Sequence, residues 1–288
     1  DDNAAHNDAQ EILSKAKAIA DEQGVNAQTL IVTGDPSSVF VELSRNYNLI
    51  VIGNRGKGGL AERLLGTTSS SLPAYAYCPY TDDKDNLLHL NNVITKVAVG
   101  SDDTKWGLRA LQIAADFAAN WGAELDVITV VPGNTNLDDP AQKQKFEDVL
   151  DARLESICTT HPDLKIRKSI VAGRAVETLT KASHTHDIVV VGSCGRGGLT
   201  GLLFNSTSQG LLQHSASPVY VVPRKFVEAE EQRVKTGTAS GTETAEVTSL
   251  EEFVREVPVE RASEETERQI EIDIDPKAHE YRQDDNEQ

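Results

Sequence analysis

Short apolar runs alternate along this chain with longer segments of helical periodicity. The runs are rich in Val, Ile and Leu and lie at residues 30–32, 49–52, 97–99, 125–130 and 188–191. Apolar runs without polar alternation are typical of parallel strands that are buried on both faces and joined by crossover helices. Between the runs, apolar residues recur at helical spacing, as at Ile12, Ala16 and Ile19 and again within 108–117. The pattern predicts an α/β fold.

The same order of runs occurs twice. A shift of 139 residues aligns 28–80 with 167–219 without a gap, and 15 of the 53 aligned positions are identical. Internal similarity at a fixed shift indicates a duplicated unit. The second copy also has an opening strand at 97–99, a helix and a second strand at 125–130, and the first copy has no counterparts of these in this sequence. We therefore predict two Rossmann-like units with open parallel sheets, of which the first is truncated.

The closing strands of the two copies differ. Residues 218–222 of the second copy are almost wholly apolar, whereas the aligned residues 79–83 of the first copy include two acids. We expect the first copy to have nearly lost this strand. Residues 219–222 should then be an edge strand, and an uncovered apolar edge invites pairing with another chain. The prediction is a homo-oligomer formed through edge strands.

Charge separates the body of the chain from its end. The formal charge of the whole chain is −17, and residues 226–288 carry −12 of it with few apolar side chains. Such a segment cannot bury enough apolar surface to offset the chain entropy lost on folding. We expect a mostly disordered acidic tail that either improves solubility or binds an unidentified protein partner. The predicted organisation is a truncated repeat at 1–80, a linker at 81–92, a second repeat at 93–225 and the tail at 226–288.

Composition argues against several classes of protein. With 28 basic against 45 acidic residues, the chain lacks the concentrated basic face that nucleic-acid binding requires. No apolar run approaches the roughly 18 residues of a membrane span and no signal segment opens the sequence, so we expect no membrane contact and a cytoplasmic location. The three cysteines lack metal-binding spacing, so we predict no metal site. The sequence contains no Met and starts at Asp1, so we expect it either to be a fragment of the natural translation product or to lack that product's methionines.

A glycine-rich loop follows the second strand-like run of each aligned segment. The residues of interest are Gly53, Gly56, Gly66 and Thr67 in the first copy, and Gly192, Gly195, Asn205, Ser206 and Thr207 in the second. A loop that leaves the carboxyl end of a buried parallel strand lies where α/β sheets bind ligands. Its glycines let backbone N–H groups approach an anion, and the hydroxyl groups and free amides at the start of the next helix add donors. Arg196 would add positive charge, so the loops predict phosphate binding.

These loops resemble the nucleotide signature G-x2-G-x9-G-[ST] of the universal stress protein family, specifically of its tandem-domain, ATP-binding branch. The first copy matches all four positions, whereas Asn205 stands in place of the third glycine in the second copy. The resemblance covers residues 8–225. It implies that Asp102, which follows the opening strand of the second copy, faces the adenosine part of the ligand, and that Val130 is a further contact. The first copy has no counterpart of Asp102.

The resemblance implies an ATP-binding regulator of the stress response, with ATP bound alone or together with Mg²⁺. Two alternatives stay open, a scaffold of the same fold that binds no nucleotide and a slow ATP hydrolase. The sequence contains no hydrolase or metalloprotease motif and no evident general base. We therefore expect no catalytic residues and a protein that is not an enzyme.

Overall fold

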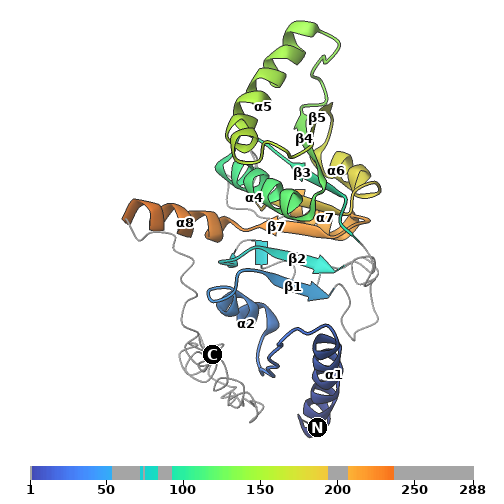
Figure 1. The fold of residues 1–288 in the computed structure, drawn as a ribbon, viewed down its shortest axis with the longest axis vertical. Coiled ribbons are helices and arrows are strands. Elements are labelled where there is room, and N and C mark those ends of the chain that lie inside the picture. Colours follow the sequence, from blue (N-terminus) through green and yellow to red (C-terminus); the bar gives the residue numbers. More distant parts are fainter. Residues whose placement is uncertain (1, 54–71, 74, 84–92, 194–206, 237–288) are drawn as a thin grey trace. The chain divides into compact units, whose positions relative to one another are not determined.

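The computed structural model describes residues 2–53, 72–73, 75–83, 93–193 and 207–236 (Figure 1). The chain divides into two compact units, one containing residues 1–35 and the other residues 36–246. Helices and strands alternate along the larger unit, and its strands form one mostly parallel, seven-stranded sheet. The predicted α/β fold class is confirmed.

The smaller unit contains the helix that the sequence predicts. Helix α1 (Asp2–Glu22) carries Ile12 and Ile19, which are both exposed. Gly24 follows the helix, and its φ of 69° is the left-handed conformation that glycine adopts without strain. The N–H group of Val25 then closes the helix end by donating to the carbonyl oxygen of Ala20 at 2.9 Å.

The strand predicted at 30–32 does not form. This segment has only a single bridge residue at Ile31. Its aligned counterpart lies in strand β5 (Ile166–Ala172), which pairs along its whole length with strand β4 (Glu124–Val131). A strand needs a neighbour to receive its backbone hydrogen bonds. This sequence has no counterpart of β4 in the first copy, so the same apolar pattern gives no strand there.

The larger unit is built on a sheet with the strand order β1-β2-β7-β6-β3-β4-β5 (Figure 1). All neighbouring strands are parallel except β2 and β7. The chain runs from β3 outward through β4 to β5, and then returns to the other side of β3 through β6 and β7. The remaining strands are β1 (Ile50–Gly53), β2 (Tyr80–Asp83), β3 (Lys96–Gly100), β6 (Ile188–Gly192) and β7 (Val219–Val222).

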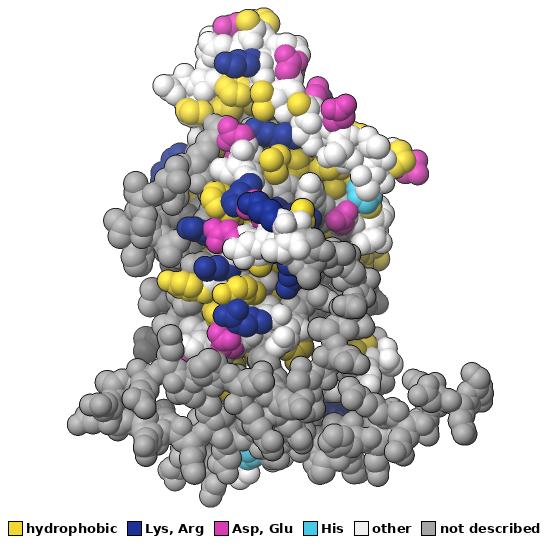
Figure 2. Space-filling view, turned by 90° about the vertical axis from the view of Figure 1, so that its left-hand side faces the viewer, with side chains coloured by type: hydrophobic (Ala, Val, Ile, Leu, Met, Phe, Trp, Pro, Cys, Tyr) yellow, Lys and Arg dark blue, Asp and Glu magenta, His cyan; other side chains and the backbone are white. Residues whose placement is uncertain are grey.

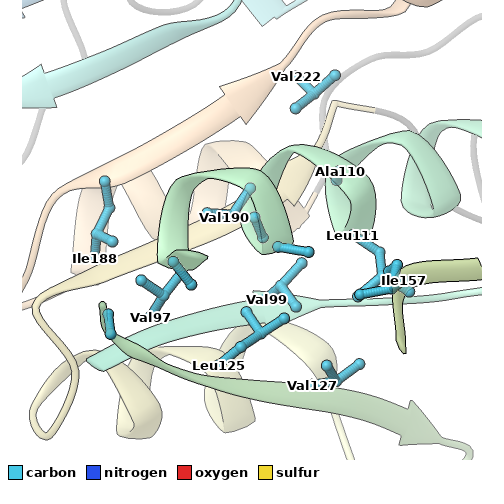
Figure 3. Packing of buried hydrophobic residues seen from close by; sticks show 14 of the residues in the cluster. Val97, Val99, Ala110, Leu111, Leu125, Val127, Ile157, Ile188, Val190 and Val222 are labelled. Atoms are coloured by element: carbon cyan, nitrogen blue, oxygen red, sulfur yellow. The ribbon is translucent and has the colours of Figure 1, made fainter. Parts of the chain in front are cut away.

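Helices cover both faces of this sheet. On one face α4, α5 and the start of α8 pack on side chains that include Val99, Val127 and Val190 (Figure 3). On the other face α2, α6 and α7 pack on the alternate residues of the same strands, such as Ala98 and Ile128. Because successive strand residues point to opposite faces, the uninterrupted apolar runs fill both layers. The helices are α2 (Pro36–Leu43), α4 (Lys105–Trp121), α5 (Pro140–Thr160), α6 (Ala175–Ser183), α7 (Thr207–His214) and α8 (Arg224–Thr236).

The closing strand of the first copy is present, contrary to our expectation. Residues 80–83 form β2, which pairs with β7 through Tyr80↔Val221 and Thr81↔Tyr220. The prediction that residues 219–222 form an edge strand is therefore wrong, because β2 of the same chain occupies that edge. The predicted linker at 81–92 also begins inside a strand. A homo-oligomer formed through edge strands stays a prediction.

Buried contacts explain why β2 forms despite its two acids. Tyr80 has no exposed surface and lies in the apolar cluster that also contains Val219 and Val221. The carboxylate of Asp82 accepts a hydrogen bond of 2.6 Å from the N–H group of Val219. The Asp82 side chain thus accepts a hydrogen bond from β7 of the kind that a backbone carbonyl group accepts in a regular strand pair.

A hydrogen bond recurs at the 139-residue shift seen in the sequence. The hydroxyl oxygen of Ser44 accepts from the N–H group of Tyr77 at 2.8 Å, and that of Ser183 accepts from the N–H group of Ala216 at the same distance. Each bond ties the end of a helix to the segment before the closing strand. The aligned segments therefore share tertiary contacts as well as sequence.

One apolar strand position in β1 is exposed although its aligned position in β6 is buried. Val51 of β1 is 60% exposed, whereas the aligned Val190 of β6 is 1% exposed. Val190 lies in the cluster that α4 covers. This sequence contains no counterpart of α4 in the first copy, so Val51 has no helix of that kind to bury it.

The predicted tail begins with a packed helix, so the expected boundary between 225 and 226 falls inside α8. Val227 is buried against the cluster under α4. The guanidinium of Arg109 donates two hydrogen bonds of 2.7 Å to the Glu230 carboxylate, and the Lys105 ammonium lies 2.7 Å from Glu231. Acidic and basic side chains accordingly mix on the face that carries α8 (Figure 2). The rest of the predicted tail, 237–288, lies outside the described residues.

Truncation after Arg224 is expected to lower the free energy of unfolding by about 2 to 3 kcal/mol. The loss comes mainly from exposing the pocket of Val227, because burial of such a side chain contributes about 1.5 to 3 kcal/mol. The partly exposed pairs of Arg109 and Lys105 add less than about 1 kcal/mol each. Chemical denaturation measures the effect. Truncation after Thr236 keeps α8 and is the matched control; equal stability of the two proteins would contradict the packing of α8.

Candidate functional site

Asp102 and Gly192 lie at the carboxyl ends of two neighbouring strands. β3 and β6 are parallel, with Val99 opposite Val190. Asp102 follows β3 by two residues, and Gly192 is the last residue of β6. The chain leaves β3 toward β4 but returns on the side of β6, so the loops part here and open the crevice in which α/β sheets bind ligands. The fold brings the two predicted residues to this switch point of the sheet, where a ligand crevice is expected.

A capping interaction positions the Asp102 carboxylate. Its Oδ1 atom accepts hydrogen bonds from the N–H group and the hydroxyl of Thr104, at 3.1 and 2.5 Å. The Thr104 hydroxyl in turn accepts from the N–H group of Gly107 at 3.1 Å and so caps α4. Within the part of the chain that the structure describes, Oδ2 of Asp102 has no such partner. This oxygen is the one available to accept from a ligand.

Gly107 makes the position of Asp102 possible, although the sequence analysis did not identify it. A Cβ atom at Gly107 would overlap Oδ1 of Asp102 and lie 3.0 Å from its backbone nitrogen. Any side chain would therefore displace the carboxylate. The sequence signal for this role is a glycine in the first turn of a helix, where glycine lowers helix stability by about 1 kcal/mol relative to alanine.

Gly192 has a packing role that does not depend on a ligand. A Cβ atom there would lie 3.0 Å from both the carbonyl carbon and the carbonyl oxygen of Trp106. These are backbone atoms of α4, which cannot shift as a side chain can. The glycine therefore lets α4 approach the end of β6. A substitution at Gly192 would change the fold and the loop together.

The other predicted residues are only partly described. Val130 lies near the end of β4 and packs on the face covered by α6 and α7. Thr207 is the first residue of α7 and is half-buried. Gly53 ends β1, and among the described residues no atom beyond its chain neighbours lies within 4 Å of the place its Cβ would take. The predicted residues outside the described ranges are Gly56, Gly66, Thr67, Gly195, Arg196, Asn205 and Ser206.

Two buried polar groups close to this crevice were also missed. The hydroxyl oxygen of Ser101, a residue only 4% exposed, and Nε1 of Trp106 have no hydrogen-bond partner in the described structure. Ser101 directly follows β3, and Trp106 lies in the first turn of α4. Buried polar groups are nearly always hydrogen-bonded. A water, a ligand or a residue outside the described ranges would satisfy these two groups.

Two hollows lie on the surface of the described residues. One of about 500 Å³ lies between α4 and α5 and is lined by Asp103, Leu108 and Val149, among others. Another of about 560 Å³ lies between α5 and β5, at Cys158 and Lys168. In the described ranges no three His, Cys, Asp or Glu side chains are grouped to hold a metal ion. None of the described helices is long and apolar enough to cross a membrane.

Comparison with known proteins identifies the family. The model of the universal stress protein family matches residues 1–81 and 94–223, which is most of the chain. The chain belongs to the universal stress protein family. The resemblance inferred from the two glycine-rich loops is thereby confirmed.

Several relatives of this universal stress protein span most of its length. It is 33% identical to Universal stress protein Rv2005c of Mycobacterium tuberculosis H37Rv over 219 residues. The alignment covers 71% of this chain and 72% of the relative. A universal stress protein of Mycolicibacterium smegmatis is 29% identical over 231 residues, covering 77% of each chain. The crystal structure of a universal stress protein from Archaeoglobus fulgidus DSM 4304 has a TM-score of 0.60 at 25% identity and covers 77% of this chain and 78% of its own.

Proposed function

We propose that this universal stress protein binds ATP, alone or with Mg²⁺, at the carboxyl ends of β3 and β6 and acts as a nucleotide-dependent regulator of the stress response. The observation that carries the proposal is the placement of Asp102 and Gly192 at the ends of adjacent parallel strands. A nucleotide needs acceptors for its sugar hydroxyls and backbone donors for its phosphates. This crevice combines a carboxylate with the start of a glycine-rich loop.

The chemistry of the described residues fits such a ligand. Oδ2 of Asp102 is available to accept a hydrogen bond from a sugar hydroxyl, and the buried Ser101 hydroxyl supplies a further polar group. Gly192 starts the loop whose backbone amides would approach the phosphates. Bound ATP would supply negative charge, which Mg²⁺ would partly neutralise. The first copy lacks a counterpart of Asp102, so the proposal concerns the second copy.

The position of α4 supports a regulatory role. This helix begins at the cap formed by Asp102 and Thr104, and its first two turns hold α8 through Lys105 and Arg109. A ligand that changes the geometry of Asp102 would therefore act on α4. Through Lys105 and Arg109 of α4 it would also act on α8, the helix at the start of the acidic tail. We assign Asp102 to the sugar hydroxyls of the nucleotide, so we propose binding and regulation rather than hydrolysis.

An Asp102→Asn variant is expected to bind ATP about tenfold more weakly than the wild-type protein. A charge-assisted hydrogen bond contributes about 1.5 kcal/mol, which corresponds to that factor. The asparagine oxygen can still accept from Thr104, so the cap and the fold should persist. Isothermal titration calorimetry with ATP, with and without Mg²⁺, measures the affinity, and thermal denaturation checks the fold.

The matched control is Asp103→Asn, which removes the same charge from the adjacent exposed position. Its affinity for ATP should stay within a factor of about two of wild type, as surface charges have small effects. A wild-type protein that binds no ATP in either condition would refute the proposal. Equal loss in both variants would show that net charge, and not the position of Asp102, determines the affinity.

A further inference from the structure

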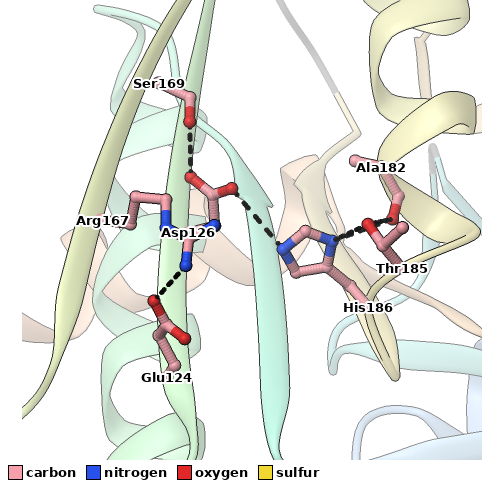
Figure 4. A network of polar contacts seen from close by, with 7 residues as sticks. All are labelled: Glu124, Asp126, Arg167, Ser169, Ala182, Thr185 and His186. Carbon is pink, nitrogen blue, oxygen red and sulfur yellow. Dashed lines mark hydrogen bonds and ion pairs between the residues drawn. The ribbon is translucent and has the colours of Figure 1, made fainter.

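His186 and Asp126 form a buried ion pair at the amino end of the sheet, away from the proposed ATP site (Figure 4). His186 lies in the turn between α6 and β6, and Asp126 is the third residue of β4. Each side chain is 11% exposed, and Nε2 of His186 lies 3.6 Å from Oδ2 of Asp126. The pair thus fastens a connecting turn to a strand that lies two positions away in the sheet.

Both ring nitrogens of His186 face oxygen acceptors. Nδ1 lies 2.8 Å from the carbonyl oxygen of Ala182, and Nε2 faces the Asp126 carboxylate. A neutral imidazole has one N–H group, whereas the protonated ring has two. The geometry is therefore matched by the protonated ring. Ser169 donates a hydrogen bond of 2.8 Å to the other carboxylate oxygen of Asp126, so the acceptor side is also held in place (Figure 4).

Charged groups on three strands surround the pair. Arg167 of β5 and Glu124 of β4 are joined at 2.7 Å, and Arg167 acts on Asp126. Lys96 of β3 opposes the positive ring, whereas the adjacent Asp187 carries a negative charge and accepts hydrogen bonds from the N–H groups of Thr95 and Lys96. Two cations, Arg167 and Lys96, and two carboxylates, Glu124 and Asp187, therefore surround the ion pair of His186 and Asp126.

The titration of both groups is displaced in the direction that stabilises the pair. The Asp126 carboxylate raises the pKa of His186 above 6.5, and this outweighs the opposing effect of burial. Burial alone would raise the pKa of Asp126, but the contacts with His186 and Ser169 outweigh it and hold that pKa below 3.8. The ion pair is therefore complete between these limits.

Helix α6 connects this pair to the carboxyl ends of the strands. Leu179 of α6 packs so closely on Gly100, the last residue of β3, that a Cβ there would lie 2.8 Å from its Cδ1 atom. Val176 of the same helix packs in a similar way on Gly210 of α7. A change in how the carboxyl end of α6 is held would therefore alter the support of β3 and α7.

We propose that His186 and Asp126 form a pH-sensitive anchor that holds the α6–β6 turn against β4 when the ring is protonated and releases it when the ring loses its proton. A group whose pKa is higher in the folded state contributes stability that is complete below its unfolded value, here 6.5, and is lost as the pH rises through the folded value. The pKa of Asp126 is lower in the folded state, so the stability that Asp126 contributes is lost only as the pH falls below 3.8. Acidification from slightly alkaline to slightly acidic conditions thus tightens α6.

A histidine titration of the full chain by NMR tests the first step. The wild-type signal of His186 is expected to titrate above 6.5, and in an Asp126→Asn variant it should titrate at a lower pH, because the Asp126 carboxylate is the largest cause of the raised pKa. A wild-type titration at or below 6.5 overturns the proposal. This measurement needs no variant to be as stable as the wild-type protein.

Hydrogen exchange of the amides at 182–187, corrected for the intrinsic effect of pH, tests the second step. Protection in the wild-type protein is expected to be higher at pH 6 than at pH 8, because the protonated ring holds the turn at the lower pH. A His186→Gln variant should lose this dependence, whereas His184→Gln, an exposed position in the same turn, should keep it. The same pH dependence in His186→Gln and wild type would overturn the anchor.

Discussion

A Gly107→Ala variant is expected to bind ATP at least tenfold more weakly and to lose about 1 to 3 kcal/mol of free energy of unfolding, the usual cost of overpacking. The added Cβ would overlap Oδ1 of Asp102 and lie 3.0 and 3.1 Å from the backbone nitrogen and oxygen of the same residue. Either Asp102 or the first turn of α4 must move. Both movements break the cap in which Asp102 accepts from Thr104.

Helix propensity makes this a sharp test. Alanine stabilises a helix by about 1 kcal/mol relative to glycine, so without the close contact the variant would be more stable than wild type. Chemical denaturation and calorimetry with ATP measure the two effects. The control is Gly133→Ala in the loop after β4, where a Cβ would meet only the Cα atom of Gly173 at 3.7 Å. A Gly107→Ala protein that is more stable than wild type would contradict the approach of α4 to Asp102.

An Asp82→Ala variant is expected to lower the free energy of unfolding by about 2 to 3 kcal/mol. The substitution leaves the N–H group of Val219 without its acceptor, and an unsatisfied buried group costs about 1 to 3 kcal/mol. It also removes atoms from a site that is only 3% exposed. β2 and β7 are joined at only two register positions, so this side chain extends a short ladder. Segments β1 and β2 should become more sensitive to proteolysis.

Two further variants separate the causes. Asp82→Asn keeps an oxygen that can accept from Val219 and should lose less stability than Asp82→Ala. Asp163→Ala, at an exposed turn before β5, should change the free energy of unfolding by less than about 0.5 kcal/mol. If Asp82→Ala matched Asp163→Ala in stability and in resistance to proteolysis, the Asp82 side chain would not stabilise the pairing of β2 with β7.

The core strands of the second copy could be predicted from the sequence alone. The apolar runs at 97–99, 125–130 and 188–191 lie in β3, β4 and β6. A strand covered by helices on both faces needs apolar side chains at successive positions, and few other elements of this length share that requirement. The two glycine-rich loops were likewise enough to indicate the family, since their spacing recurs in both copies.

In the first copy, the presence of a neighbouring strand determines which segments form strands. Residues 30–32 are apolar but form no strand, whereas residues 80–83 include two acids and form β2. A strand exists where another strand completes its hydrogen bonds. β7 supplies that partner to β2, and Val219 gives its N–H group to the Asp82 side chain. No local pattern in either segment contains this information.

For the candidate site too, the sequence indicated some of the residues and the tertiary structure revealed others. Residue types and spacing indicated Asp102 and Gly192, which end neighbouring strands. The tertiary structure alone revealed that α4 passes so close to both that Gly107 and Gly192 cannot carry side chains, and that Ser101, the residue before Asp102, is buried. The pair of His186 and Asp126 likewise joins segments that are distant in the sequence. Local periodicity determines which residues can form a strand or a loop, but close contacts and buried polar pairs depend on which segments meet, and that is set by the packing of the whole sheet.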